Sequence, residues 1–473
     1  MNPLSSRALA AMLVGWRLSD GVPAYSALAD RIRLLVLDGR IGLGVRLPAE
    51  RDLAAQLDVS RTTVSAAYAE LRQRGYLDSV RGSGSVARLP RRAEPISDSL
   101  ASDLLDFSKA AMPAVPAVAA AAERAAALLP AYLGESGFDP IGLLVLRQAL
   151  ADRYTARGLP TDADQLMITI GAQNAIALLC RTLLARGDRA LVESPSYPHA
   201  FEALRSAGGR LVPVSVTTDE GWDEAGIEQA IQRTSPSLGY LMPDFHNPTG
   251  RTMDAGMRAR ILELASRQGT TIIADETMAE LSVDGQPLEK PFAAFGSAVT
   301  VGSVGKSVWG GLRIGWIRAD RELIQRAARV RFASDLGTPV IDQLVVAELL
   351  PEYDAILESR RRLLRAGRDH LVSRLREKLP EWDVPNVSGG LTAWVNLGIP
   401  VSSQLTIAAR NEGLVIAAGP RFGVDGVFER FLRIPFSYSA EETDRAVDAL
   451  AAAWRNVART PYVESDEFMS QVV

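Results

Sequence analysis

The stretch Ser303 to Trp316, SVGKSVWGGLRIGW, decides how the rest of the sequence is interpreted. Lys306 is one of only four lysines in the chain, and it is the one that lies in a run of small residues. Burial among such residues lowers the pKa of an amine and makes it a nucleophile toward carbonyl groups. Arg313 follows shortly after and carries the planar guanidinium that suits a phosphate dianion. The stretch therefore predicts a reactive lysine beside an anion site, the alternative being an ordinary loop lysine.

A lysine that forms a Schiff base, with a phosphate clamp nearby, is what the cofactor pyridoxal 5'-phosphate (PLP) requires. The surrounding sequence predicts the fold that would hold it. From Leu166 onward, short apolar runs alternate with helical patterns such as 175–185 and 257–268. The runs cover residues 166–170, 189–193, 210–216, 238–243, 270–276 and 298–304. Buried strands that alternate with helices predict an α/β domain, with a mostly parallel sheet covered by helices on both faces.

Ligands of such sheets bind at the C-terminal ends of the strands, and candidate residues follow the strands here. Gly171-Ala172-Gln173-Asn174 opens a helix whose N-terminus can hold a phosphate. Tyr197 can stack on a flat cofactor or, with equal weight, pack in the core. Asn247 can donate a hydrogen bond to a phenolate oxygen. Asp275 ends an apolar strand and is costly to bury unpaired, so a protonated pyridine nitrogen would suit it.

The strings GAQ, SPSYP, NPTG, ADET and SVGK…GLRIGW, in this order, resemble those of the fold-type I aminotransferases over about residues 106–460. The resemblance implies Lys306 as the lysine of the internal aldimine and Asp275 as the partner of the pyridine nitrogen. It further implies a set of cofactor contacts: Asn247 at the 3-oxygen, Tyr197 stacked on the ring, and Ala172, Gln173, Ser303 and Arg313 at the phosphate.

Two more roles follow from the same resemblance. Active sites of this family form across a homodimer, which implies that Tyr132 reaches the phosphate in the other subunit. Arg433, in the string FLRIPFSY, matches the arginine that clamps a substrate carboxylate, the alternative being a surface ion pair.

Two positions depart from the family pattern. Relatives that join such a domain to a DNA-binding domain usually have a tyrosine two residues after the strand-end acid. That tyrosine donates a hydrogen bond to the cofactor 3-oxygen. Here that position is Thr277, a shorter donor. The second serine of the usual S-x-S-K string is Gly305, which removes a hydroxyl from the neighbourhood of the lysine.

The first ninety residues predict a separate DNA-binding domain. Helical patterns cover residues 24–37, a segment starting near Pro48, and a segment capped by Ser60 that ends near Arg74. The last two, joined by a short turn, form a helix-turn-helix whose second member can present its first residues to the major groove. Residues 78–87, DSVRGSGSVA, predict a two-stranded wing.

The strings RLPAER (46–51), VSRTTV (59–64), RGYL (74–77) and RGSGS (81–85) resemble the winged helix-turn-helix of the GntR family over residues 23–88. The resemblance implies a set of residues at double-stranded DNA: Arg51, Arg61, Thr62, Thr63 and Arg81, with Ser60 and Gly82 beside them. Glu50 is interpreted as a residue that interacts with a helix end or with another side chain of the same domain, and not as a DNA contact.

Charge and composition agree with a basic DNA-binding part on an acidic body. The first 92 residues carry a net charge of +6, and the remainder carries −10 for a chain total of −4. No apolar run of membrane-spanning length and no signal peptide is apparent, so we expect a cytoplasmic protein without a membrane segment. One cysteine and three scattered histidines give no expectation of a metal site.

A GntR-like head joined to an aminotransferase-like body resembles the MocR subfamily of transcription regulators. The predicted boundaries are a DNA-binding domain at 1–88, a linker at 89–105, a PLP-binding domain with a smaller C-terminal subdomain at 106–460, and a tail at 461–473. The resemblance implies a regulator that senses PLP, or a small amine or amino acid, through Lys306. The alternative is an active aminotransferase with a secondary DNA-binding head. A body that only dimerises is disfavoured because the cofactor residues are intact.

Overall fold

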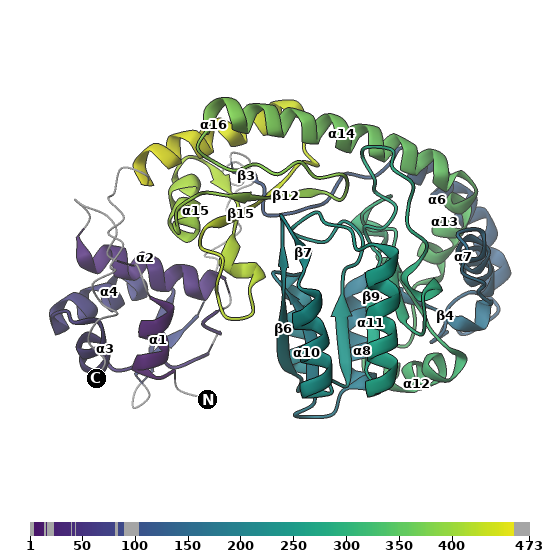
Figure 1. Ribbon diagram of the computed structural model, residues 1–473, viewed down its shortest axis with the longest axis horizontal. Coiled ribbons are helices and arrows are strands. Elements are labelled where there is room, and N and C mark those ends of the chain that lie inside the picture. The colour runs from purple at the N-terminus through teal and green to yellow at the C-terminus, as the bar shows by residue number, and fades with distance from the viewer. Residues whose placement is uncertain are drawn as a thin grey trace. The chain divides into compact units, whose positions relative to one another are not determined.

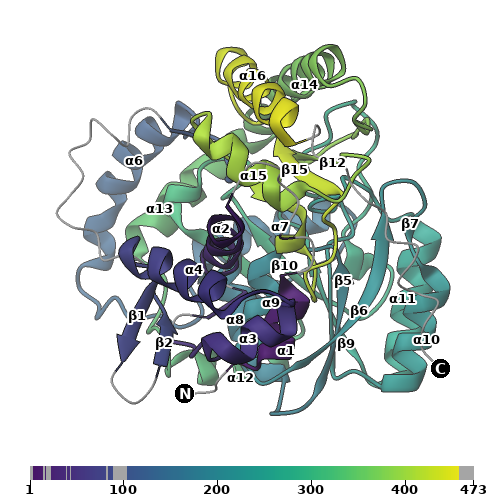
Figure 2. The ribbon, with the colours of Figure 1, turned by 90° about the vertical axis from the view of Figure 1, so that its left-hand side faces the viewer.

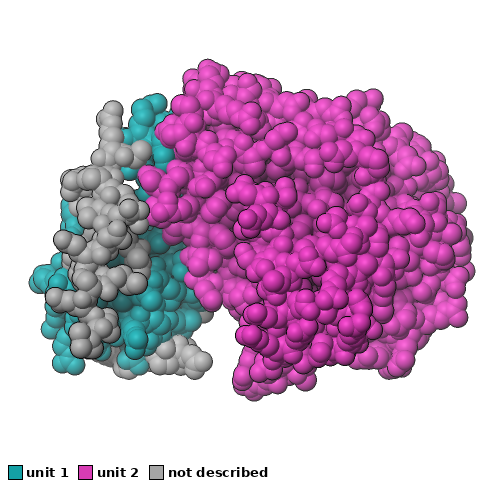
Figure 3. All heavy atoms as spheres, viewed as in Figure 1, with its two compact units in different colours: residues 1–106, 401–415, 449–473 teal, residues 107–400, 416–448 magenta. Residues whose placement is uncertain are grey.

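The structure, a computed structural model, describes residues 4–13, 16, 23–38, 40–42, 44–80, 84–88 and 104–457. The chain divides into two compact units, shown in Figure 3: residues 1–106, 401–415 and 449–473 form the first, and residues 107–400 and 416–448 form the second. Within the described residues, no helix combines the length and the apolar character needed to cross a membrane.

The first unit contains the predicted helix-turn-helix. The pattern over 24–37 is helix α2 (Ala24–Leu37), and the two motif helices are α3 (Glu50–Leu57) and α4 (Arg61–Gln73). Asp58 adopts a left-handed conformation with φ 50° and turns the chain between them. Ser60 is the N-cap of α4, as predicted, because its hydroxyl accepts a hydrogen bond from the amide of Thr63.

The predicted wing is also present. Strand β1 (Leu77–Val80) pairs antiparallel with β2 (Gly84–Ala87), and Figure 2 shows them as two adjacent arrows. Arg81 and Gly82, predicted to contact DNA from the tip of the wing, lie outside the described residues. The sequence patterns do not predict helix α1 (Ser6–Met12), which packs against α3.

The apolar sides of these helices meet in one core. Leu28, Ile32, Leu53, Val64 and Leu71 are each at most 1% exposed. The hydroxyl of Tyr68, buried in the same core, donates to the backbone oxygen of Pro48 at 3.0 Å. Val64, Tyr68 and Leu71 of α4 are spaced i, i+4 and i+7, and all three lie on its buried face.

The second unit is built on an eight-stranded sheet of order β4-β11-β10-β9-β8-β5-β6-β7. The strands are β4 (Leu166–Ile170), β5 (Arg189–Ser194), β6 (Arg210–Thr217), β7 (Gly221–Trp222), β8 (Leu238–Leu241), β9 (Thr271–Asp275), β10 (Val299–Ser303) and β11 (Ile314–Arg318). Strands β10, β9, β8, β5 and β6 are parallel, while β11 and β7 are antiparallel to their neighbours. The predicted mostly parallel sheet is confirmed.

Helices cover both faces of this sheet, because successive strand residues point to opposite sides. Val192, Tyr240 and Ile273 share one buried cluster with α8 and α9, while their neighbours share a second cluster with α10 and α11. The helices, seen in Figures 1 and 2, are α6 (Ala117–Leu128), α7 (Leu144–Ala156), α8 (Gly171–Leu183), α9 (Pro198–Ser206), α10 (Glu224–Thr234), α11 (Ala255–Gln268), α12 (Arg321–Arg331) and α13 (Val340–Leu349).

A smaller C-terminal subdomain follows the long helix α14 (Tyr353–Lys378). Its sheet has the order β12-β15-β14, with β12 (Thr392–Asn396), β14 (Ala417–Ala418) and β15 (Phe431–Pro435). Asp444 of helix α16 (Ala440–Val457) forms ion pairs with His370 and Arg374 of α14. In the first unit, β13 (Leu414–Val415) pairs with β3 (Leu105–Asp106) beside helix α15 (Ser402–Asn411).

Candidate functional site

The residues predicted to hold the cofactor stand where the main-sheet strands end. Strands β4, β5, β8, β9 and β10 all run in one direction, so their C-terminal ends meet at one edge. The candidates follow these strands: Ala172 and Gln173 after β4, Tyr197 after β5, Asn247 after β8, Asp275 at the end of β9, and Ser303 and Lys306 at and after the end of β10.

The Lys306 side chain is partly buried in the turn that follows β10. Its Nζ donates a hydrogen bond to the backbone oxygen of Ala110 at 2.6 Å. The pKa of the amine is lowered from 10.5 to about 8, mainly by burial and also by the nearby charge of Arg433, while the charge of Asp275 opposes both. A larger share of the amine is therefore neutral, and so nucleophilic, than in an exposed lysine.

The turn that carries Lys306 is held by Ser303. The Ser303 hydroxyl donates to the backbone oxygen of Ile314 at 2.9 Å and accepts from the amide of Gly305 at 3.0 Å. A Cβ atom at Gly305 would lie 3.1 Å from the Ser303 oxygen, tighter than ordinary contact. The glycine that departs from the family pattern thus allows a close approach between the two residues.

Asp275 is 3% exposed, and burial raises the pKa of its carboxyl. The hydroxyl of Tyr240, from β8, donates to one carboxylate oxygen at 2.6 Å. The hydroxyl and the amide of Thr277 donate to the other at 2.7 and 3.0 Å. These three bonds favour the ionised form that would attract a protonated pyridine nitrogen. Because the Thr277 hydroxyl is directed at Asp275, its role toward the cofactor 3-oxygen stays a prediction.

Backbone geometry at the start of α8 brings Arg313 close to the helix N-terminus. The guanidinium donates to the backbone oxygen of Ile170 at 3.0 Å. Gly171 has φ 75°, and a Cβ atom there would lie 2.8 Å from Arg313 Nη2. A side chain at Gly315 would likewise strike the backbone of Gly171. The free amides of the first helical turn and a guanidinium together form a suitable phosphate site.

Several buried polar atoms around these strand ends have no hydrogen-bond partner within the described residues. They are Gln173 Oε1, Ser196 Oγ, Asn247 Oδ1 and Arg433 Nε. A buried polar atom without a partner costs about 1–3 kcal/mol, so four of them in one region indicate a site built for a polar ligand. Together with the reactive lysine, the buried acid and the phosphate-binding turn, they fit PLP.

Tyr197 lies among the charged groups of this region. Burial raises the pKa of its phenol to about 12, with Asp275 and Glu202 raising it further and Arg313 and Arg433 opposing. Its ring is half-buried, so a face remains for a flat ligand. Stacking on the cofactor remains a prediction.

Arg433, on β15, is 7% exposed and has the surroundings of an anion site. Its guanidinium donates to the backbone oxygen of Ser108 and lies 5.0 Å from the ring centre of Phe422. Burial lowers its pKa to about 10, and the charge of Arg421 adds to the effect. No carboxylate in the described part of the chain pairs with it, so the alternative of a surface ion pair does not apply.

Tyr132 ends the short helix η1 (Leu129–Tyr132) and is half-buried. Its hydroxyl has no hydrogen-bond partner among the residues that the structure describes. Its predicted contact with the phosphate of a second subunit stays a prediction.

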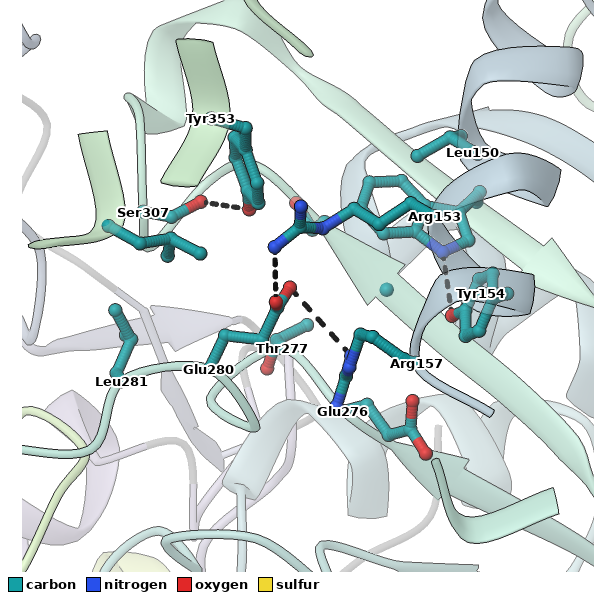
Figure 4. A pocket seen from close by; sticks show the side chains of 14 residues that line it. Leu150, Arg153, Tyr154, Arg157, Glu276, Thr277, Glu280, Leu281, Ser307 and Tyr353 are labelled. Atoms are coloured by element: carbon teal, nitrogen blue, oxygen red, sulfur yellow. Dashed lines mark hydrogen bonds and ion pairs between the residues drawn. The ribbon is translucent and has the colours of Figure 1, made fainter. Parts of the chain in front are cut away.

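A small charged pocket lies beside the lysine turn and is shown in Figure 4. Arg153 and Arg157 both pair with Glu280, and Tyr353 shares a 2.7 Å hydrogen bond with Ser307, the residue after Lys306. Glu276, next to Asp275, is also buried there, and burial raises its pKa to about 7.

The candidate DNA-binding residues in the head are largely exposed. The side chains of Arg51 and Arg61 are 86% and 74% exposed. The Ser60 hydroxyl lies 2.6 Å from that of Thr62 and 2.8 Å from that of Thr63, so Ser60 acts first as the helix cap. Glu50 lies 4.0 Å from Arg61 and 3.9 Å from Arg72, in agreement with its interpretation as a partner within the domain.

Two contacts at the site were not predicted from the sequence. Tyr240 is the donor to Asp275, and the signal for it was a polar aromatic residue in an otherwise aliphatic buried strand, which must find a hydrogen-bond partner. Ala110 provides the backbone oxygen for Lys306. A backbone oxygen so far away in the chain cannot be predicted from residue types, because every residue has one.

Comparison with protein families agrees with both halves of the chain. Residues 100–450 match the family of class I and II aminotransferases, and residues 24–86 match the gntR family of bacterial regulatory proteins. The two matches in this order are the MocR-like architecture.

Relatives of both kinds are similar to this chain. The HTH-type transcriptional regulator YisV of Bacillus subtilis (strain 168) is 27% identical over 90% of this chain and 94% of its own length. The regulator YdcR of Escherichia coli (strain K12) is 28% identical over 90% and 98%. The crystal structure of LysN, an alpha-aminoadipate aminotransferase from Thermus thermophilus complexed with N-(5'-phosphopyridoxyl)-L-leucine, is 27% identical with a TM-score of 0.68, covering 78% of this chain and 96% of LysN.

Proposed function

The chain belongs to the family of class I and II aminotransferases and carries a GntR-type DNA-binding head, and on this premise we propose that it is a transcription regulator that senses PLP, or an amine or amino acid, through Lys306. Its cofactor is PLP. The observation that carries the proposal is the joint presence of an exposed helix-turn-helix start and a buried lysine whose pKa is lowered to about 8.

Different residues of the body would bind different parts of the cofactor. Lys306 would bind it covalently, and Asp275, supported by Tyr240 and Thr277, would hold the proton on its pyridine nitrogen. The first turn of α8 and Arg313 would bind its phosphate. When bound, PLP supplies an aldehyde that reacts with amines and a ring that withdraws electrons. Arg433 would bind the carboxylate of an amino-acid effector.

A second subunit would cover an exposed apolar region around Tyr132. Leu133, Phe138 and Leu144 are 70%, 68% and 62% exposed, which is unusual for large apolar side chains so close together in sequence. We assign this region to a homodimer in the cytoplasm, in which Tyr132 reaches the phosphate site of the partner. Two heads would then bind two half-sites of an operator.

The regulator proposal is tested by DNA binding of the full-length protein. An operator fragment is selected from random-sequence DNA, and its affinity is measured with and without PLP and then with added amino acids. The wild type should change its affinity or footprint when PLP is added, because a ligand shifts an equilibrium by its differential affinity for two states. Lys306→Ala should bind the same DNA and no longer respond. Indifference of the wild type to PLP and to every amine would favour the enzyme.

The alternative function, an active aminotransferase, is supported by the intact set of Lys306, Asp275, Asn247 and Arg433 and by the similarity to LysN. Lys306 would then move a proton to and from the substrate Cα. Single-turnover conversion of an amino acid to its keto acid separates the two functions. A regulator needs no such turnover.

A further inference from the structure

Four consecutive backbone oxygens just inside the second unit accept hydrogen bonds from side chains of the candidate site. Residues 108–111, here called the strap, form no helix or strand. The pairs are Arg433 with Ser108, Tyr438 with Lys109 at 2.9 Å, Lys306 with Ala110 at 2.6 Å, and Ser437 with Ala111 at 3.1 Å.

The strap depends on these donors because its backbone oxygens have no regular ladder or helix to bond with. Phe107, directly before the strap, is buried, and its ring stacks on that of Tyr438 with centroids 4.0 Å apart. Two of the four donors have a second predicted use. Lys306 would bond to the cofactor, and Arg433 would bind a carboxylate.

The Lys306 amine cannot keep its hydrogen bond to the strap and bind a ligand in the same geometry. Lys306 would hold PLP through one C=N bond, formed from its amine and the aldehyde with loss of one water, and its nitrogen would then be withdrawn from the backbone oxygen of Ala110. A carboxylate that binds Arg433 through Nη2 would compete with the oxygen of Ser108 for that nitrogen, since a charged acceptor forms the stronger hydrogen bond. Each ligand therefore competes with one strap contact.

We propose that the strap occupies the ligand-binding groups of the site and is displaced in two steps, first by PLP at Lys306 and then by a carboxylate at Arg433. This inference rests on the proposed function and adds the step by which ligand binding at the site would reach the DNA-binding head. The strap follows the predicted 89–105 linker almost directly in the sequence, so its displacement acts on the segment that leads to the DNA-binding head.

A nitroxide label at an exposed strap position tests the displacement in the full-length protein. Lys109→Cys carries the label in a Cys180→Ala background, since Cys180 is the only cysteine of the chain. The label should become more mobile when PLP is added, and more mobile again with propanoate, which has a carboxylate and no amine to exchange with Lys306. In Lys306→Ala, PLP should no longer raise the mobility. Equal mobility with and without both ligands would overturn the proposal.

A second measurement removes a strap contact that has no predicted ligand role. Tyr438→Phe keeps the ring that stacks on Phe107 and deletes the hydroxyl bound to Lys109. The loss of one competing hydrogen bond should tighten PLP binding about three- to tenfold. Ser437→Ala should act in the same direction. The matched control is Tyr68→Phe, which deletes a hydroxyl–carbonyl hydrogen bond in the head.

An unchanged dissociation constant for PLP in both strap variants would also overturn the proposal, as would a failure of every variant to bind PLP. Neither measurement involves DNA. A strap that moves in a protein whose DNA binding ignores PLP would therefore contradict the proposed function and leave the displacement intact.

Discussion

In the head, four of the residues predicted to contact DNA, Ser60 to Thr63, are sequence neighbours at the exposed start of α4, where the Arg61 side chain is 74% exposed. In the body, the candidate residues come from separate strand ends between Ala172 and Arg433, and most are at least partly buried. The difference follows from the ligands. DNA is a large polyanion that binds to the protein surface, so the residues that contact it are exposed. A small cofactor needs reactive groups whose pKa values are shifted by burial. Changes in one region should therefore leave the other intact.

The largest effect is expected at the lysine. Lys306→Ala should abolish the adduct that borohydride traps between protein and PLP, because none of the other three lysines lies in the turn that follows β10. Mass spectrometry of the reduced protein measures it, and operator binding without PLP should stay at the wild-type level. An adduct that persists in the variant would show that another lysine reacts.

The pH dependence of adduct formation tests whether the pKa of Lys306 in the body is lowered. Only the neutral amine reacts, and the Lys306 pKa is lowered to about 8. The rate should thus rise about tenfold per pH unit below 8 and level off above it. Stopped-flow absorbance measures the profile. Arg433→Gln removes a positive neighbour, so it should raise the pKa of Lys306 and move the profile to higher pH.

Arg433→Ala should weaken binding of amino acids to the PLP-bound protein by about 10- to 150-fold, the loss of a charge-assisted hydrogen bond of about 1.5–3 kcal/mol. Titration of the cofactor spectrum with amino acids gives the dissociation constants. Arg430→Ala, an exposed arginine just before the same strand, is the matched control. Equal losses in both variants would mean that Arg433 has no specific role.

On the head side, Arg61→Ala should weaken operator binding by about 1–3 kcal/mol if Arg61 contacts a base, with the cofactor spectrum unchanged. Fluorescence anisotropy at fixed salt gives the affinity. Arg74→Ala, at the far end of the same helix, is the control for the loss of a surface ion pair. Unchanged affinity in Arg61→Ala would place the recognition surface elsewhere.

The smallest expected effect is that of Ser60→Ala, which removes the N-cap of α4. Stability of the head should fall by about 1 kcal/mol, because one helix amide loses its acceptor. Thermal denaturation followed by circular dichroism measures it, and Ser60→Asp should restore the cap. A larger loss of DNA affinity than of stability would mean that the Ser60 hydroxyl also contacts DNA.

Much of this architecture could be predicted from local patterns. Helix α2 and the Ser60 cap lie where spacing and residue type predict them, and the strand-end positions of Asn247, Asp275 and Lys306 follow from the order of apolar runs. Helix α1 was missed because seven residues carry too little periodicity to stand out. The Thr277 and Gly305 departures were visible, but their consequences depended on neighbours that only the fold supplies.

The sequence by itself determined the two families, the parallel sheet and the residue types of the cofactor site, because these depend on short strings and on local periodicity. Only the tertiary structure decided that Tyr240 and Thr277 hold Asp275, and that Lys306 and Arg433 bind backbone oxygens of residues 108–111. Except for the contact between Thr277 and Asp275, these contacts join positions far apart in the chain, and half of the four involve backbone atoms that every residue possesses. No pattern of side chains can encode them.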